Sequence, residues 1–190
     1  MINPTQLQHY WEKGISFQAF LDQINLLHQE NKVTGHTQNQ ELLDYSLLNE
    51  HRMNRIIKQG KQYPINGTKA GLSRILVITE GWCGDSAQTL PFIFKWSSLQ
   101  NVELRIVGRD DYPELMDQFL TNGSRSIPVM IGLNDNFNVM FQWGPRPSEL
   151  VVKMEEWKGQ GIVKPELGQH MHQWYAKNAG EAAWTEWEQL

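Results

Sequence analysis

The sequence of 190 residues predicts an α/β fold in which a central mixed β-sheet is flanked by helices. Over residues 74–157, short stretches of β-branched or alternating apolar residues are interleaved with stretches of helical periodicity. Strands separated by a helix pair in parallel, whereas two later strands joined by a short turn form an antiparallel hairpin. A hydrophobic content of 40% and a charged content of 20% suit a globular protein, so we treat 1–190 as a single domain.

A helical N-terminal extension is expected over residues 1–60. Thr5 is a candidate cap for a first helix that ends at Gly14, and Ser16 is a candidate cap for a second. A third helix is predicted from about Gln40 to Lys58, with Gly60 as its stop. Its expected core residues are Leu43, Leu47, Met53, Ile56 and Ile57. On the same helix, Arg52, Arg55 and Lys58 form either a basic patch or, more commonly for such residues, a solvated face.

The predicted core of the fold covers about residues 72–157. Its first strand is the apolar run at 75–78, and the helix that follows extends to about Ser98, with Leu90, Ile93 and Phe94 directed inward. Val102–Val107 alternates apolar and charged residues, as a second strand does. The remaining expected elements are a short helix at Tyr112–Leu120, strands at Val129–Leu133 and Phe137–Gln142, and a helix capped by Ser148 that contains Leu150, Val151 and Met154.

A C-terminal helical tail is expected over residues 162–190. It carries an apolar stripe followed by further aromatic residues, which are Leu167, Met171, Trp174, Tyr175, Ala183, Trp184 and Trp187. We expect one or two helices packed onto the body of the protein. The alternative is that the three tryptophans dock a partner subunit, which would make a homodimer.

The chain has one cysteine, Cys83, at the turn between the first strand and the helix that follows it. Backbone N–H groups and the dipole at a helix N-terminus favour a thiolate there, so we expect an exposed thiol with a depressed pKa. The charge of Asp85 opposes this weakly, and the hydroxyl of Ser86 favours the thiolate.

The segment Trp82-Cys83-Gly84-Asp85-Ser86, which follows a buried strand and precedes Pro91, resembles the active-site segment of the thioredoxin family. Ile127-Pro128 resembles the loop that carries the cis-proline of that family, and Trp143-Gly144 falls where the family has a third substrate-facing turn. The resemblance implies a thioredoxin-like three-layer fold with a cis bond before Pro128. It is closest to bacterial proteins with Trp-Cys-Gly-Asp-Cys, but here Ser86 replaces the second cysteine.

The resemblance also implies the candidate site residues. They are Cys83 and Ser86 for catalysis, Trp82, Gly84, Asp85, Ile127, Pro128, Trp143 and Gly144 for substrate binding, and Arg125 and Arg146 as candidates for tuning the pKa of Cys83. Val77 stands where thioredoxins usually carry a buried carboxylate that helps proton transfer.

Three functions remain open at this point. The first is a monothiol (CxxS) protein that forms mixed disulfides through Cys83 with a protein or a low-molecular-weight thiol, because a serine hydroxyl cannot resolve the adduct. The second is a redox-inactive module that binds an extended peptide or partner protein at the cis-proline groove. The third is a dithiol enzyme that has lost its second cysteine. An efficient dithiol reductase is not expected.

Composition argues against several other classes. The net charge of −4 gives no reason to expect nucleic acid, and no apolar run approaches the ~20 residues that span a bilayer, so no membrane partner is expected. The N-terminus does not look like a signal peptide, and a single cysteine fits a reducing cytoplasm, which is the expected location. No phosphate-binding glycine loop or zinc-type cluster is present, so neither a cofactor nor a metal is expected.

Overall fold

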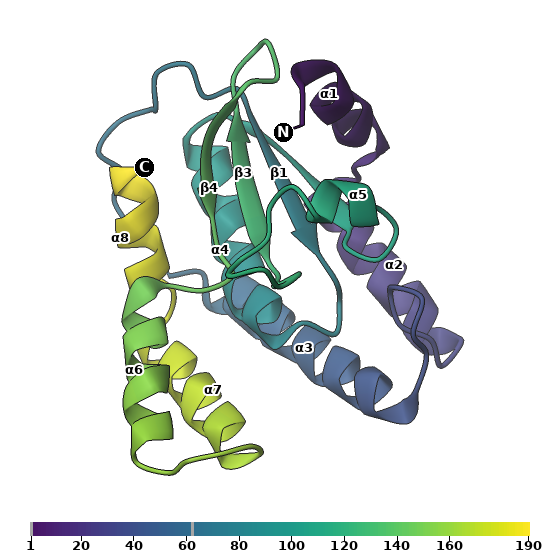
Figure 1. Ribbon diagram of the computed structural model, residues 1–190, viewed down its shortest axis with the longest axis vertical. Helices are drawn as coiled ribbons and strands as arrows, with labels where there is room; N and C mark the ends of the chain where they lie inside the picture. Colours follow the sequence, from purple (N-terminus) through teal and green to yellow (C-terminus); the bar gives the residue numbers. More distant parts are fainter. Residues whose placement is uncertain (1, 62) are drawn as a thin grey trace.

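The computed structural model describes residues 2–61 and 63–190, and in them eight helices surround one four-stranded sheet (Figure 1). The helices are α1 (Pro4–Lys13), α2 (Phe17–Gln29), α3 (Gln40–Gln59), α4 (Gly84–Leu99), α5 (Pro113–Met116), α6 (Ser148–Gly159), α7 (Glu166–Asn178) and α8 (Glu181–Gln189). The strands are β1 (Arg74–Thr79), β2 (Glu103–Gly108), β3 (Val129–Leu133) and β4 (Val139–Trp143).

The sheet has the order β2-β1-β3-β4 and is mixed, as the sequence predicts. β1 pairs in parallel with β2 and antiparallel with β3, and β3 pairs antiparallel with β4. Val77 in the centre of β1 lies opposite Ile106 of β2 and Met130 of β3. Such a central strand is covered on both faces, which explains why the run at 75–78 is continuously apolar and completely buried.

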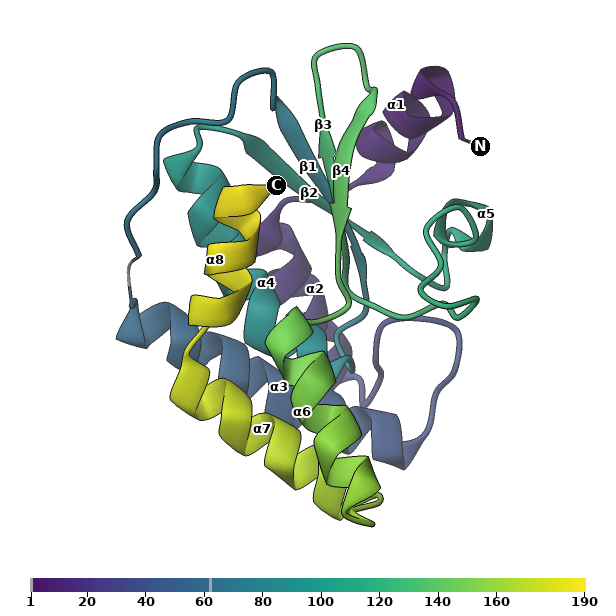
Figure 2. The ribbon, with the colours of Figure 1, turned by 60° about the vertical axis from the view of Figure 1, so that its left-hand side comes forward.

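Helices cover both faces of the sheet, so the architecture has three layers (Figure 2). One face packs against α2, α3, α4 and α8 through a cluster that includes Phe20, Val77, Ile93 and Trp187. The other face packs against α1 and α5 through a second cluster, to which Cys83 belongs. This arrangement is a thioredoxin-like fold with added N-terminal and C-terminal helices.

Several predicted boundaries are wrong in detail. Asn3, not Thr5, caps α1 in a reciprocal capping box with Gln6. The helix predicted at Tyr112–Leu120 is the single turn of α5, followed by irregular turns. Ser148 is the first residue of α6 and not its cap, because its backbone N–H and hydroxyl both contact Glu186 of α8.

Four predicted core residues are exposed. They are Leu47, Ile57, Phe94 and Val151. Each lies beside the buried stripe of its helix, where helical periodicity alone does not decide the width of the covered face. Phe94 is nevertheless ordered by stacking on Phe17 of α2, with ring centroids 4.7 Å apart.

The C-terminal tail packs onto the body, as expected. Trp184 and Trp187 of α8 are buried in the first cluster, and Leu150, Met154 and Tyr175 join α6 to α7. Two carboxylates of α8 accept hydrogen bonds from buried indole groups: Glu188 from Trp96 and Glu186 from Trp143, each at 2.6 Å. Among the described residues, no helix is long and apolar enough to cross a membrane.

Candidate active site around Cys83

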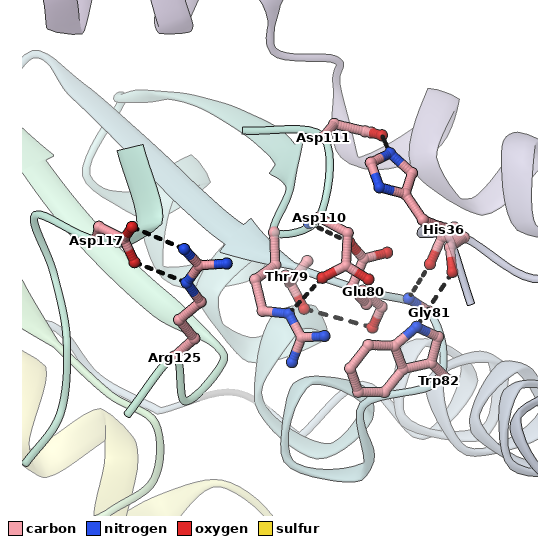
Figure 3. A network of polar contacts seen from close by, with 11 residues as sticks. His36, Thr79, Glu80, Gly81, Trp82, Asp110, Asp111, Asp117 and Arg125 are labelled. Carbon is pink, nitrogen blue, oxygen red and sulfur yellow. Dashed lines mark hydrogen bonds and ion pairs between the residues drawn. The ribbon is translucent and has the colours of Figure 1, made fainter. Parts of the chain in front are cut away.

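The turn between β1 and α4 places Cys83 at the N-cap of α4. Gly81 within this turn is held from two sides. Its N–H donates to Thr34 Oγ1 at 2.8 Å (Figure 3), and its carbonyl accepts from Asn49 Nδ2 at 3.1 Å. A side chain at Gly81 would meet Ile24 of α2 at about the 3.0 Å limit of contact. The turn is therefore anchored by the N-terminal helices, and the position of the cysteine depends on them.

The cis-proline loop faces the cysteine. The Ile127-Pro128 bond is cis, as the resemblance implies, and Cys83 Sγ donates to the Ile127 carbonyl at 3.2 Å. Gly144 has a φ of +125° and packs so closely on the Pro128 carbonyl that no side chain fits between them. The structure thus brings together the β1–α4 turn, the cis-proline loop and Gly144, three segments far apart in the sequence.

The prediction of an exposed, acidic thiol is wrong. Cys83 is only 8% exposed, and its burial, followed by the charge of Asp85, raises its pKa to about 11. Hydrogen bonds from the Ser86 hydroxyl and from the backbone of Ser86 and Asp85 act in the opposite direction but are outweighed. The helix terminus does favour the thiolate, but the loss of solvation in the apolar cluster around the sulfur is the larger effect.

Asp85 is fixed by two residues from distant parts of the chain. Its carboxylate accepts hydrogen bonds from Arg146 Nη2 at 2.5 Å and Nε at 3.1 Å, and from the Tyr175 hydroxyl at 2.7 Å. Burial and the Asp85 charge raise the pKa of Tyr175 well above its usual value, so the phenol remains a donor. Asp85 therefore ties α4 to the β4–α6 connection and to α7.

Ser86 is 2% exposed and accepts a hydrogen bond from Thr79 Oγ1 at 2.5 Å. It occupies the position of the second cysteine in the family motif, but it lies in the interior between β1 and α4. Its hydroxyl acts on Cys83 only by favouring the thiolate. In this arrangement Ser86 is a buried hydrogen-bonding residue.

Three residues with expected roles make other contacts. Arg125 is exposed and forms a two-pronged ion pair with Asp117 at 2.6 and 2.7 Å, so it does not tune the thiol (Figure 3). Trp143 is buried in the core edge-to-face with Trp187, at 5.2 Å between ring centroids, and does not line a substrate surface. Trp82 is half-buried and donates its indole N–H to the Thr34 carbonyl at 3.1 Å.

Glu80 forms a separate polar network behind Trp82 (Figure 3). It is 1% exposed, and its Oε1 accepts the N–H of Asp110 at 3.0 Å. Burial raises the pKa of Glu80, and the charges of Asp110 and Asp111 add to that effect. No group of three or more histidine, cysteine or acidic residues in the described part of the chain has the geometry of a metal site.

Sequence reasoning missed two residues of α7 that reach the motif. Tyr175 contacts Asp85 across 90 positions of sequence. The ring of His172 lies against Gly84, with Cε1 3.1 Å from the position that a Cβ atom would take there. The apolar stripe in the tail identified the helix, but nothing in the stripe indicated which surface it would cover.

These features define a thioredoxin-like α/β protein whose single-cysteine motif faces a cis-proline at the N-terminus of α4. A sequence model described as thioredoxin matches residues 35–158, which is more than half of the chain, and the protein belongs to the thioredoxin family.

Two solved structures resemble this chain. One is a protein of unknown function from Pseudomonas aeruginosa, with 19% identity, a TM-score of 0.49, and coverage of 96% of this chain and 100% of that one. The other is an HIV epitope scaffold, with 18% identity, a TM-score of 0.48, and coverage of 87% and 94%. No curated protein matches the chain.

Proposed function

We propose that the protein is a redox-silent binding module of the thioredoxin fold, in which the surface around the N-terminus of α4 recognises a ligand. The observation that carries the proposal is the burial of the Cys83 thiol against the Ile127 carbonyl. A thiol attacks a disulfide only as the thiolate, and only where the disulfide can reach it. Both conditions are unfavourable at Cys83.

The size of the effect follows from the pKa. With a pKa of about 11, roughly one Cys83 in ten thousand is ionised at pH 7, against a few per cent of free cysteine. The fraction of thiolate is thus roughly 300-fold smaller than for free cysteine. The more basic thiolate is intrinsically more nucleophilic, but with a Brønsted slope of about 0.4–0.5 this raises the reaction rate only about tenfold. The thiol is therefore about thirtyfold slower than free cysteine before steric protection is counted.

The surroundings of the motif support the same conclusion. Ser86 cannot resolve a mixed disulfide, and Val77 of β1 is fully buried among apolar residues and supplies no proton-transfer group. The Ile127 carbonyl already accepts a hydrogen bond from the thiol, so an extended peptide at this edge would have to displace that contact.

A second candidate is monothiol exchange, which is favoured by the close approach of Sγ to the loop of the cis-proline. After a movement that exposes the sulfur, the Cys83 thiolate would attack a disulfide RSSR, forming Cys83–S–SR and releasing RS⁻. An external thiolate R′S⁻ would then attack the R sulfur, which restores the Cys83 thiolate and gives RSSR′. This route uses an external disulfide and an external thiol and needs no second cysteine.

Alkylation separates the two candidates. We expect iodoacetamide to modify folded Cys83 at least about thirtyfold more slowly than free cysteine at neutral pH, and at the ordinary rate in denaturant. Incubation with cystine should leave the folded protein without an adduct by mass spectrometry. Cys83→Ser serves as the unreactive control. Alkylation as fast as that of free cysteine, or a stoichiometric cystine adduct on the folded protein, would exclude the redox-silent proposal and favour monothiol exchange.

A further inference from the structure

A cavity of about 370 Å³ lies between α3 and α7, with α4 beneath it. Figure 2 shows α3 and α7 side by side on the face of the molecule opposite to α1 and α5. The polar lining of the cavity consists of His51, Arg52 and Arg55 of α3, Gln88 of α4, and His172 and Gln173 of α7. The remaining lining residues are Leu48 and Ala176, so no acidic side chain lines the cavity.

The two arginines of the cavity have no ionic partner among the residues that the structure describes. The close arginine–carboxylate contacts in those residues all involve other arginines, namely Arg74, Arg105, Arg109, Arg125 and Arg146. Arg52 is half-buried, and its Nη1 donates only to the neutral side chain of Asn49 at 2.8 Å. Burial and then the charge of Arg55 lower the pKa of Arg52, so the two cations destabilise each other. This arrangement occurs in a chain whose net charge is −4.

His172 adds a third polar group to the lining of the cavity. Its ring lies against Gly84, and its Nδ1 is buried without a hydrogen-bond partner among the described residues. Burial and then the Arg52 charge lower the pKa of His172 to about 4, so the ring is neutral at pH 7 and keeps one N–H to donate. Gly84 is the first residue of α4, a helix of 16 residues whose N-terminus favours negative charge.

We propose that this cavity binds the anionic group, a carboxylate or a phosphate, of a small ligand, held by Arg52 and Arg55 beside His172 and the N-terminus of α4. A bound anion would neutralise the two unpaired guanidinium groups and accept charge-assisted hydrogen bonds from them. The volume lies near the lower end of the roughly 300–1,000 Å³ of small-molecule sites, which favours a small metabolite over a macromolecule.

The inference rests on the binding role proposed above and names the chemistry of the ligand. It does not use the reactivity of Cys83. Anion binding and Cys83 alkylation are separate measurements, so failure of one does not decide the other.

The test is a titration of the ¹⁵N-labelled full chain with inorganic phosphate and, separately, with succinate. We expect the His172 imidazole signals to shift with saturation for at least one of the two anions, and the melting temperature to rise with its concentration. The better-bound anion identifies the group as a phosphate or a carboxylate. Chloride at matched ionic strength controls for general screening.

Variants assign the site. Arg52→Gln and Arg55→Gln should each weaken binding about tenfold or more, because each removes a charge-assisted contact. Lys58→Gln is the matched control, since it removes one positive charge from the same helix but does not line the cavity. Absence of a saturable His172 shift with both anions, or equal binding by the double arginine variant and the wild-type protein, would overturn the proposal. A fold check by circular dichroism accompanies each variant.

Discussion

The Tyr175→Phe substitution tests how firmly the C-terminal helices are docked to the cysteine motif. It deletes one hydroxyl and leaves the aromatic ring, which is 4% exposed and packed between α6 and α7. The lost contact is the 2.7 Å hydrogen bond from Tyr175 to the Asp85 carboxylate. No other described contact of the phenol oxygen changes.

The expected cost follows from the chemistry of that bond. A hydrogen bond to a charged group contributes about 1.5–3 kcal/mol. Asp85 keeps both contacts to Arg146, so its charge stays compensated and the cost should lie in the lower half of that range. We therefore expect a loss of about 2 kcal/mol in the free energy of unfolding, or about 4–8 °C in melting temperature for a chain of this size.

Urea unfolding followed by tryptophan fluorescence measures this loss, with the m value checked for constancy. Tyr45→Phe is a matched control, because Tyr45 of α3 is 46% exposed and its hydroxyl has no hydrogen-bond partner among the described residues. The control should change stability by less than about 0.5 kcal/mol. If both variants lose equally little, the hydrogen bond between Tyr175 and Asp85 contributes nothing and the argument for a docked α7 is refuted.

Three further predictions concern stability. Glu80→Gln keeps an acceptor for the Asp110 N–H and removes a buried carboxylate, whose pKa is raised above 4.5. The variant should therefore be more stable than the wild-type protein at pH 7. In urea titrations this gain should vanish below about pH 4.5, where Glu80 is protonated in both states. His172 binds a proton less readily in the folded protein than in the unfolded chain. Its neutral form therefore contributes fully to the free energy of unfolding above about pH 6.5, and this contribution is lost as the pH falls toward about 4. The charge of Arg52 on α3 lowers the pKa of His172, and the charge of Asp85 on α4 raises it; His51 and Arg55 of α3 line the same cavity. His172→Gln should flatten this acid slope, and an unchanged slope would contradict the assignment. Gly180→Ala should destabilise the protein by about 1–3 kcal/mol, because Gly180 has a φ of +88° and a Cβ would meet the Phe92 ring. Gly159→Ala is the control, since the space around Gly159 is open and its substitution should have no such cost. Equal melting temperatures of the two variants would refute this prediction.

The sequence predicted the layout of the sheet because each strand carries its own signal. The run at 75–78 is apolar on both faces and lies in the centre of the sheet, whereas Val102–Val107 alternates and lies at the edge as β2. The meeting of the cysteine turn with the cis-proline was expected from the family resemblance, and local patterns alone would not have indicated it.

The environment of the cysteine could not be predicted in the same way. The helix terminus that favours the thiolate is a local feature and is readable from the chain. Burial is not, because it is supplied by Ile127 and by the second hydrophobic cluster, whose members come from α1, α5 and three strands. A weak favourable effect was therefore predicted, and the stronger unfavourable one was missed.

The contribution of the tail to the site was missed for a related reason. Amphipathic spacing in 162–190 correctly predicted packed helices, but it specifies a face and not its target. The clamp between Asp85, Arg146 and Tyr175 joins three elements through polar atoms, and no spacing rule links them. Arg52 and Arg55, which sequence reasoning favoured as a solvated face, line a cavity that α7 borders; Arg55 is exposed there, and Arg52 is half-buried.

The pKa of Cys83 tests the central claim most directly. It can be measured as the pH dependence of the rate at which the folded protein reacts with iodoacetamide, with Cys83→Ser as the blank. We predict a rate that is very low at neutral pH and still rises at pH 10, as a pKa of about 11 requires. A rate that reaches its plateau below about pH 8.5 would show an accessible, activated thiolate and would contradict the account.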